Sequence, residues 1–420
     1  MIEESTEPST GQETARAPAR NRRGLLVLAV VFAIVLASSA IKNSMTAYLV
    51  PMGMSFGASR GAFALTPTLF MVTYAVMSPL VGYFADRYGG QRTMTAGLAT
   101  GAAMFLLATG VHSLPVFMVL YGVGLATAYT AVSYVPLGVL VNELFAEGRR
   151  GVMYSLLTNG TAVGFVVLSP LWIMLSSSTS WRSVYLALGV VFLALLALAV
   201  TLVPRRDPEP HRDRAAAPSL TLRGRLGLVL GERRFWIVAV PFFACGTSMA
   251  FVDVNMVADM QGSNLSGGMI STSVAVLGAA EIAGSVAAGY FADRGRRRVV
   301  LIGSYAVRGI SLVTLLMFPG AAGSVAFALL FGFSYMGTVI VSSLYLMEIF
   351  DERSRGLALG LLWFVHQTGS AASSYGGAMS YDAFNSYNVS VAAIAGTIAL
   401  AVLVSLTFSL ESNPPARKAG

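Results

Sequence analysis

The sequence has little charge for its length. Of its 420 residues, 11% are Asp, Glu, Lys or Arg, whereas 55% are hydrophobic, and the mean hydropathy is +0.69. A soluble domain carries roughly 25% charged residues, so this chain cannot cover a water-facing surface with charge. The composition therefore excludes a soluble globular protein and predicts an all-α membrane protein, for which the lipid bilayer is the solvent.

Side chains that enzymes commonly use are also scarce. The single cysteine, Cys245, excludes an internal disulfide and a CxxC metal site. The only lysines are Lys42 and Lys418, and no GxxxxGK[ST] segment occurs, which excludes a nucleotide-binding P-loop. The three histidines are too scattered for an HExxH zinc motif. We therefore expect a protein that is not an enzyme and has neither a cofactor nor a metal site.

Long apolar runs are abundant, and they determine the fold class. A helix needs ~20 apolar residues to cross ~30 Å of hydrocarbon. Twelve stretches qualify: 24–50, 60–84, 92–111, 115–143, 150–176, 183–203, 235–258, 269–292, 298–318, 321–349, 355–380 and 388–410. The sequence therefore predicts twelve transmembrane helices, and this even number puts both termini on one side of the membrane.

The basic residues indicate which side carries the termini. Of the 28 lysines and arginines, 24 fall in the tails and loops on the side of the termini, and only Arg60 and Arg182 fall in loops on the other side. Since Lys and Arg collect in cytoplasmic loops, we predict that both termini are cytoplasmic. The same asymmetry accounts for the net charge of +8, so nucleic-acid binding is not expected.

One long polar break divides the chain into two halves of six spans each. This break, 204–234, holds eight arginines, and the hexapeptide GYFADR occurs once in each half, at 82–87 and at 289–294. Two six-helix bundles related by duplication, with a cleft between them, are an arrangement found in membrane transporters. The predicted units are a disordered cytoplasmic tail without a signal peptide (1–23), an N-terminal bundle (24–203), a cytoplasmic linker (204–234), a C-terminal bundle (235–411) and a cytoplasmic tail (412–420).

The repeated hexapeptide carries a family resemblance. Its fuller copy runs from Gly82 through Asp86 to Arg92, and this GxxxDRxGxxR pattern resembles the signature that follows the second helix in the major facilitator superfamily. The resemblance implies alternating access, with Asp86 meeting a helix N-terminus across the bundle interface, where a carboxylate is stabilised. The residues implied to form a cytoplasmic gate are Gly82, Asp86, Arg87, Arg92, Asp293 and Arg294. We expect the second, degenerate copy to make the weaker contact.

Shorter stretches are similar to the monocarboxylate transporters and their oxalate/formate antiporter relatives. They surround Lys42 in the first span, Asn159 in the fifth and His366-Gln367 in the eleventh. One position departs from that branch, which carries an arginine four residues after an acid in its eighth helix, because here Ser285 follows Glu281. The resemblance implies secondary active transport of small organic anions, above all proton-coupled monocarboxylate symport. An organic anion exchanger and a proton-driven efflux pump for a hydrophobic or drug-like compound are the alternatives.

Charged residues inside the predicted spans are the candidate site. A charge in hydrocarbon costs at least ~2.5–3.5 kcal/mol, so such residues usually face a cavity. Lys42 is the candidate cation for a carboxylate, unless it snorkels to the outer surface. Glu281 is the candidate proton carrier, unless it forms a structural pair with Arg308. Arg308 is then either that partner or the guanidinium that grips the carboxylate in place of the arginine missing at Ser285.

Polar and aromatic residues of the spans complete the predicted site. Each of them either lines a cavity or joins two helices by a hydrogen bond. They are Asp253, Asn255, Asn159, His366, Gln367, Tyr48 and Tyr129. The expected partners are a small organic anion, protons and the lipid bilayer, and we expect a monomeric, multi-pass protein of the plasma membrane, or of the inner membrane in a bacterium.

Overall fold

The computed structural model describes residues 13–176, 178–205, 221–263 and 265–407, and all the regular elements in these ranges are helices. The first half contains α1 (Glu13–Ala47), α2 (Leu49–Ser55), α3 (Arg60–Tyr88), α4 (Gly90–Thr109), α5 (Leu114–Val119), the π-helix η1 (Leu120–Leu125), α6 (Ala126–Val132), α7 (Tyr134–Leu144), α8 (Arg150–Ser176) and α9 (Trp181–Leu202). The second half contains α10 (Leu222–Gly231), α11 (Arg233–Ala250), the π-helix η3 (Phe251–Asn255), α12 (Met256–Gly262), α13 (Gly267–Asp293), α14 (Arg297–Met317), α15 (Ala321–Ser334), α16 (Gly337–Ile349), α17 (Arg355–Phe384) and α18 (Asn388–Leu406).

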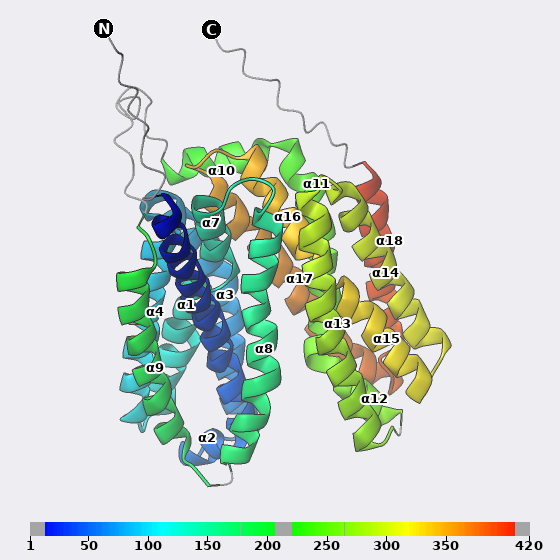
Figure 1. Cartoon of the computed structure of the whole chain (residues 1–420). Helices are drawn as coiled ribbons and strands as arrows, with labels where there is room; N and C mark the ends of the chain where they lie inside the picture. Colours follow the sequence, from blue (N-terminus) through cyan, green and yellow to red (C-terminus); the bar gives the residue numbers. More distant parts are fainter. Residues whose placement is uncertain (1–12, 177, 206–220, 264, 408–420) are drawn as a thin grey trace, which may run out of the picture.

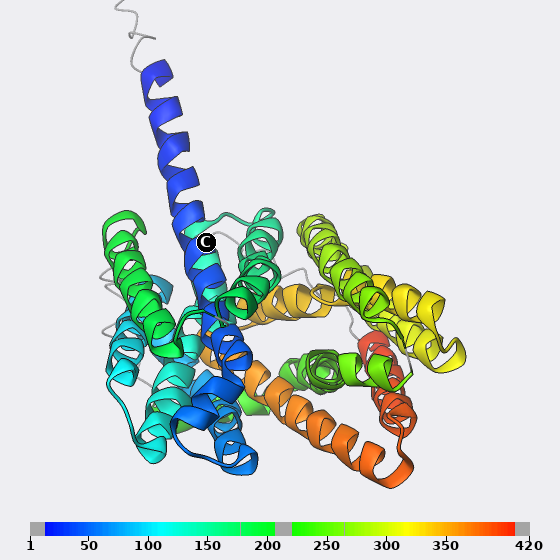
Figure 2. The same cartoon turned by 90° about the horizontal axis from the view of Figure 1, so that it is seen from below.

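The helices form two groups, α1–α9 and α11–α18, which lie on the two sides of the molecule in Figure 1. α1 begins and α18 ends at the same end of the molecule, at the top of Figure 1, which we call the terminal end. The groups meet where α3 packs against α17 and where α8 packs against α13. Seen from the opposite end, α17 runs from beside α3 to beside α18 (Figure 2), so the groups diverge away from the terminal end.

The all-α class is confirmed, and the described helices include ten segments long and apolar enough to cross a membrane. The two predicted spans outside this set, 92–111 and 355–380, are helical as expected, in α4 and α17. Their hydropathy is lowered by small and polar residues, such as His366 and Gln367 in α17, which suit a helix that packs closely inside a bundle.

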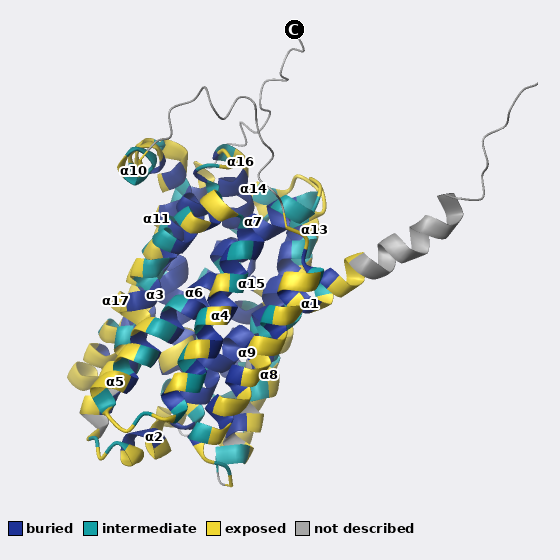
Figure 3. Ribbon diagram, turned by 90° about the vertical axis from the view of Figure 1, so that its left-hand side faces the viewer, coloured by how far each residue is buried: buried dark blue, intermediate teal, exposed yellow. Residues whose placement is uncertain are grey.

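The outward faces of the helices are apolar. On α9, Leu186, Val190 and Leu193 are 52%, 56% and 46% exposed, and their spacing puts them on one face of the helix. Figure 3 shows exposed residues on the outside of the helices and buried residues between them. An apolar exposed face and an interior that holds the polar side chains are the pattern expected of helices surrounded by lipid.

Short polar residues and glycine determine where several helices begin and end. The side chains of Ser59, Ser180 and Ser266 accept hydrogen bonds from backbone N–H groups in the first turns of α3, α9 and α13. Gly89, at φ 88°, ends α3 in the left-handed region that glycine adopts without strain. A Cβ at Gly82 would collide with the backbone of Gly356, so the repeated hexapeptide also allows α3 and α17 to touch.

Three predicted spans are interrupted in the structure. The span 115–143 contains η1 and bends at Ser133, 235–258 contains η3, and 321–349 breaks between α15 and α16. Hydrophobicity predicts the length of a span but not where the helix breaks. A break is tolerated only where polar side chains of neighbouring helices bind the backbone groups that it frees, and those neighbours are known only from the fold. π-Helical turns are frequent at functional sites, which draws attention to Asp253 in η3.

One predicted tail and the predicted linker contain helix. Residues 1–23 were expected to be disordered, but α1 begins at Glu13, since Ala and Arg favour helix and extending an existing helix is easy. The linker 204–234 contains α10, whose Val229 is buried, because the spacing of Leu222, Leu226 and Val229 gives it one apolar face. The predicted tail 412–420 lies outside the described residues.

Candidate functional site

The two copies of the hexapeptide bind the N-termini of helices from the opposite bundle. Asp86, near the end of α3, accepts hydrogen bonds from the backbone N–H groups of Gly356 and Leu357 in the first turn of α17, the latter at 2.9 Å. These N–H groups have no partner within their own helix, and they lie at the positive end of its dipole. Asp86 therefore joins the first bundle to the second at the terminal end.

Asp293 makes the reciprocal contact from the second bundle. Its two carboxylate oxygens accept from the N–H groups of Gly151 at 2.7 Å and Val152 at 2.9 Å, in the first turn of α8. We expected a weaker contact from this copy, but each aspartate makes two bonds to one helix N-terminus. The three residues between Gly289 and Asp293 are the same as in the first copy, and the basic residues that replace the rest of the motif come after Asp293.

The arginines of the two copies do not repeat this contact. The guanidinium of Arg87 lies 5.4 Å from the ring centroid of Tyr88, and that of Arg294 lies 3.5 Å from the ring of Tyr290, on its own helix. The backbone carbonyl of Arg92 accepts a hydrogen bond from Thr95. The backbone bonds that join the bundles at this end include the four accepted by Asp86 and Asp293.

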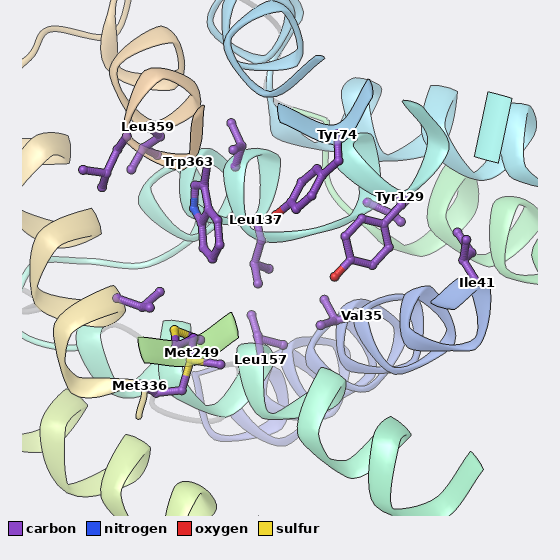
Figure 4. Close-up of a cluster of buried hydrophobic side chains, with 14 of the residues drawn as sticks. Val35, Ile41, Tyr74, Tyr129, Leu137, Leu157, Met249, Met336, Leu359 and Trp363 are labelled. Carbon is purple, nitrogen blue, oxygen red and sulfur yellow. The ribbon is translucent and has the colours of Figure 1, made fainter. Parts of the chain in front are cut away.

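Aromatic rings from both bundles lie next to this closed end. Trp363 of α17 stacks on Tyr134 of α7 with ring centroids 4.4 Å apart and 12° between the planes. Tyr74 lies 6.5 Å from Trp363 and 5.2 Å from Tyr129. In Figure 4 the labelled Tyr74, Tyr129 and Trp363 come from different helices and point into one shared space. Along α17, Trp363 stands between the start of the helix, which Asp86 binds, and His366.

Three charged residues from the two bundles form a chain of electrostatic neighbours beyond this aromatic layer. Lys42 of α1 is half-buried, and its Nζ lies 5.6 Å from the ring centroid of Tyr129. It is within electrostatic range of Asp253 in η3, which is in turn within range of Glu281 in α13. Asp253 is exposed although it lies within a span, and the hydroxyl of Tyr335 donates to its Oδ1 at 3.1 Å. We call the region between the two bundles where these residues lie the cleft.

Glu281 borders the cleft without a fixed partner. Its side chain is 9% exposed, and neither a hydrogen bond nor an ion pair holds its carboxyl group in the described structure. An unpaired carboxyl group in such a position is costly when charged unless a cation or a proton is near. Glu281 is therefore well placed to change its protonation state.

Arg308 lies inside the second bundle and not in the cleft. It is 0% exposed, and its Nη2 donates to the carbonyl oxygens of Ser334 at 2.8 Å and Tyr335 at 2.7 Å. These carbonyls are freed by the break between α15 and α16, so Arg308 supplies the donors that the interrupted helix needs. Both Arg308 and Glu281 are described, and no hydrogen bond or ion pair joins them. The geometry therefore favours neither of the two roles predicted for Arg308, which were to bind the substrate carboxylate or to pair with Glu281.

Other predicted residues are divided between the cleft and the helix packing. His366 is within electrostatic range of Asp253 and bonds to Gln367 at 3.0 Å. The Oδ1 of Asn159 accepts a hydrogen bond from the Ser285 hydroxyl at 2.9 Å, which links α8 to α13. Ser285 stands at the position where the resemblance implies an arginine. Asn255 is 5% exposed and packs against Gly377, and Tyr48 is 1% exposed.

The sequence pattern did not single out Tyr134, Tyr335 or Trp363. Trp363 precedes His366 by three residues and shares its helix face, a signal that could have been used. Tyr335 lies at the break between α15 and α16, which hydrophobicity does not reveal. Among the described residues, no group of three or more His, Cys, Asp or Glu side chains converges in the manner of a metal site.

Comparison with known proteins places this geometry in a family. The profile of the Major Facilitator Superfamily matches residues 30–256 and 242–420. The chain is 28% identical to the uncharacterized MFS-type transporter YcxA of Bacillus subtilis, over 92% of this chain and 95% of that protein. It is 24% identical to the oxalate:formate antiporter of Oxalobacter formigenes, over 89% of this chain and 87% of that protein.

Further similarity agrees with the resemblance noted in the sequence. Monocarboxylate transporter 12 of Rattus norvegicus is 24% identical over 82% of this chain and 76% of that protein. The crystal structure of FucP in the outward conformation superposes with a TM-score of 0.72 and 15% identity, covering 90% of this chain and 97% of that one, which supports the shared fold. These relatives are transporters rather than enzymes. The chain belongs to the Major Facilitator Superfamily of membrane transporters.

Proposed function

We propose that this protein is a secondary transporter of small organic anions and that Lys42 binds the substrate carboxylate. The observation that carries the proposal is the half-buried Lys42 of the first bundle, which interacts electrostatically with Asp253 of the second, and Asp253 is in turn a neighbour of Glu281. The other cation deep in a span, Arg308, is fully buried and bound to backbone carbonyls. Further support comes from two relatives whose names state anionic substrates, the oxalate:formate antiporter and monocarboxylate transporter 12.

The charge arrangement favours coupling to protons. Without substrate, Lys42 compensates Asp253 across the cleft. A bound carboxylate competes with Asp253 for the ammonium group, and the two neighbouring acids, Asp253 and Glu281, then lack a counter-charge. Uptake of one proton by this pair restores the balance, because each of two like charges close together disfavours the ionised form of the other. Substrate and proton would then cross together, as symport requires.

Alternating access follows from the position of the closed end. By the positive-inside rule the terminal end faces the cytoplasm, so the contacts of Asp86 and Asp293 close the cytoplasmic side and the conformation is outward-facing. We propose that the bundles 24–203 and 235–411, joined by the linker 204–234, rock about the cleft as rigid units. The protein would work as a monomer in the plasma membrane, or in the inner membrane of a bacterium.

Transport by reconstituted protein tests this function. Purified protein is first screened for thermal stabilisation by formate, oxalate, lactate and a set of hydrophobic compounds, and uptake of the best ligand is then measured in proteoliposomes. Symport predicts accumulation of a monocarboxylate when the outside is made acidic. Exchange that needs internal substrate and ignores the pH gradient would indicate an antiporter. Stabilisation by hydrophobic compounds alone would contradict the anion proposal.

Glu281→Gln is expected to separate substrate movement from proton movement. Glutamine keeps the shape of the side chain but carries no titratable proton, so exchange of labelled for unlabelled substrate should persist within about 3-fold while accumulation driven by a pH gradient is lost. Glu147→Gln is the matched control, since the Glu147 side chain is 84% exposed in a loop. Accumulation at the wild-type level by Glu281→Gln would assign proton coupling to another residue.

Asp86→Asn and Asp293→Asn are expected to open the terminal end to similar extents. Each change removes the negative charge from a helix N-terminus and should weaken closure by about 1–2 kcal/mol. The measurement is the rate at which a membrane-impermeant maleimide labels Leu359→Cys, a position 0% exposed in the closed structure, and we expect a rise of about tenfold in both variants.

The control for this experiment is Asp351→Asn. Asp351 is exposed and bonds only within its own loop, to Arg353 and the turn that precedes α17, so labelling should stay at the parent rate. The wild-type chain, without Leu359→Cys, gives the background from the buried Cys245. An increase for Asp86→Asn but none for Asp293→Asn would show that the second contact does not hold the closed state.

A further inference from the structure

Three soft donor atoms converge beside the cleft, in the wall of the second bundle. Cys245 and Met249 lie one turn apart on α11, and the Cys245 Sγ is 3.4 Å from the Met249 Sδ. His366 of α17 places its Nε2 3.3 Å from the same Met249 Sδ, and it also interacts with the thiol of Cys245. A thiol, a thioether and an imidazole thus meet within contact distance, supplied by two helices that pack together.

Backbone packing holds the donors in place. α11 and α17 approach closely where Gly246 touches the backbone of His366, and a Cβ at Gly246 would collide with the His366 carbonyl. The hydroxyl of Ser370 bonds back to the Gly246 carbonyl at 3.2 Å. The His366 ring is further confined between Phe242 and Trp363, with centroids 5.0 and 4.9 Å away. The relative position of the three donors is therefore determined by the fold.

The geometry points to a binding site for a monovalent soft metal ion, Cu(I), formed by Cys245, Met249 and His366. Thiolate and thioether sulfur select Cu(I) over hard cations, and imidazole binds copper as well. The function of the carboxylate site does not require this cluster, and the sequence offered no hint of it, because the donors do not follow a CxxC or HExxH spacing.

The surrounding charge favours a monovalent ion. Arg308 donates from Nη1 to the Cys245 Sγ at 3.1 Å, and Thr338 Oγ1 lies 3.2 Å from the same sulfur. A thiolate balances Cu(I), so the bound ion adds no net charge beside the guanidinium, whereas a divalent ion would leave two like charges close together in a poorly solvated site. Hydrogen bonds to a ligating sulfur are the outer contacts that orient metal ligands.

The donors need only a small adjustment to bind an ion. Ligand bonds of about 2.0–2.3 Å in a trigonal arrangement put the donor atoms roughly 3.7–4.0 Å apart, compared with 3.3 and 3.4 Å here. Met249 can supply the difference, because its unbranched side chain has three rotatable bonds. Of the three donors, Met249 is 7% and His366 4% exposed, whereas Cys245 is 0% exposed, so an ion would reach Met249 and His366 first.

Competition for Cu(I) tests the site directly. Full-length protein in detergent is titrated, without oxygen and with ascorbate, against the coloured Cu(I) complex of bicinchoninate. We expect the wild type to withdraw one equivalent of Cu(I) per chain, and Zn(II) to compete at least about 100-fold less well. Cys245→Ser, Met249→Leu and His366→Phe should each weaken Cu(I) binding by at least about 100-fold, because loss of an outer contact alone costs 10–100-fold.

The matched control is Met94→Leu, which changes a methionine that is 2% exposed in the first bundle and should leave Cu(I) binding unchanged. If Cys245→Ser fails to fold, Met249→Leu decides the question, since leucine keeps the volume and apolar character of the side chain. Retention of the tight equivalent in Met249→Leu and His366→Phe, failure of the wild type to take up Cu(I), or equally tight binding of Zn(II) would overturn the proposal. Because no transport is measured, this result is independent of the carboxylate proposal.

Discussion

Lys42→Gln is expected to reduce uptake of a carboxylate substrate into proteoliposomes by at least about 100-fold. The substitution leaves the substrate carboxylate facing Asp253 and Glu281 without the cation that compensates them. Removing one partner of a desolvated charge pair typically costs about 2–5 kcal/mol, most of it from the charge left behind. The loss should appear both in uptake and in thermal stabilisation by substrate, since the ammonium group contributes to binding itself.

The chain offers a matched control for this change. Its only other lysine is Lys418, outside the described residues, and Lys418→Gln should transport at the wild-type rate. Lys42→Arg keeps the charge but replaces a compact ammonium group by a planar guanidinium, so we expect partial activity with a weakened apparent affinity. Wild-type uptake by Lys42→Gln would show that the carboxylate is bound elsewhere. Lys42 would then only extend its ammonium group to the membrane surface, without a role in binding.

The sequence identifies the charged residues in apolar spans as candidate site residues, but it does not predict which of them lie close together. Lys42, Asp253 and Glu281 each stand out because a charge is expensive in hydrocarbon. Nothing in the sequence says that α1, η3 and α13 bring these three together, since their contacts join both halves of the chain. The aromatic layer is harder still, because the chain has 16 tyrosines and the pairing of Tyr134 with Trp363 depends on how the bundles meet.

The contacts of the two aspartates between the bundles could be predicted in more detail, because the hexapeptide is repeated. Its aspartate was expected at a helix N-terminus, and Asp86 binds the start of α17. The altered ending of the second copy, Gly295 to Arg298, predicts a weaker contact, whereas Asp293 makes the same number of bonds as Asp86. The residues that make the contact, from Gly289 to Asp293, are unchanged between the copies, so the repeat itself carried the correct information.

Arg308 shows why the remaining site residues required the structure. A lone arginine in an apolar span suggests a substrate clamp, but a break in a neighbouring helix creates an equally strong need for donors. The break between α15 and α16 follows from packing, and no hydrophobic pattern reveals it. A guanidinium has five N–H donors, so Arg308 can bind the two carbonyls and still donate to the sulfur of Cys245.

Arg308→Met is therefore expected to destabilise the folded protein by about 3–5 kcal/mol, the cost of leaving buried partners of a charged group uncompensated. Methionine fills much of the space but leaves the carbonyls of Ser334 and Tyr335 without the donors that the broken helix requires. Unfolding in detergent gives the measurement, and Arg308→Lys should recover only part of the loss, since one ammonium group cannot reproduce the fork.

The control and the ligand response together separate a structural arginine from a substrate clamp. Arg298→Met removes an exposed guanidinium that bonds one carbonyl, that of Leu406, and should change stability little. If Arg308 were a clamp, Arg308→Met would keep the unliganded stability of the wild type and lose only the stabilisation by substrate. We expect the reverse, a less stable protein in which the surviving folded fraction still gains stability from a carboxylate bound at Lys42.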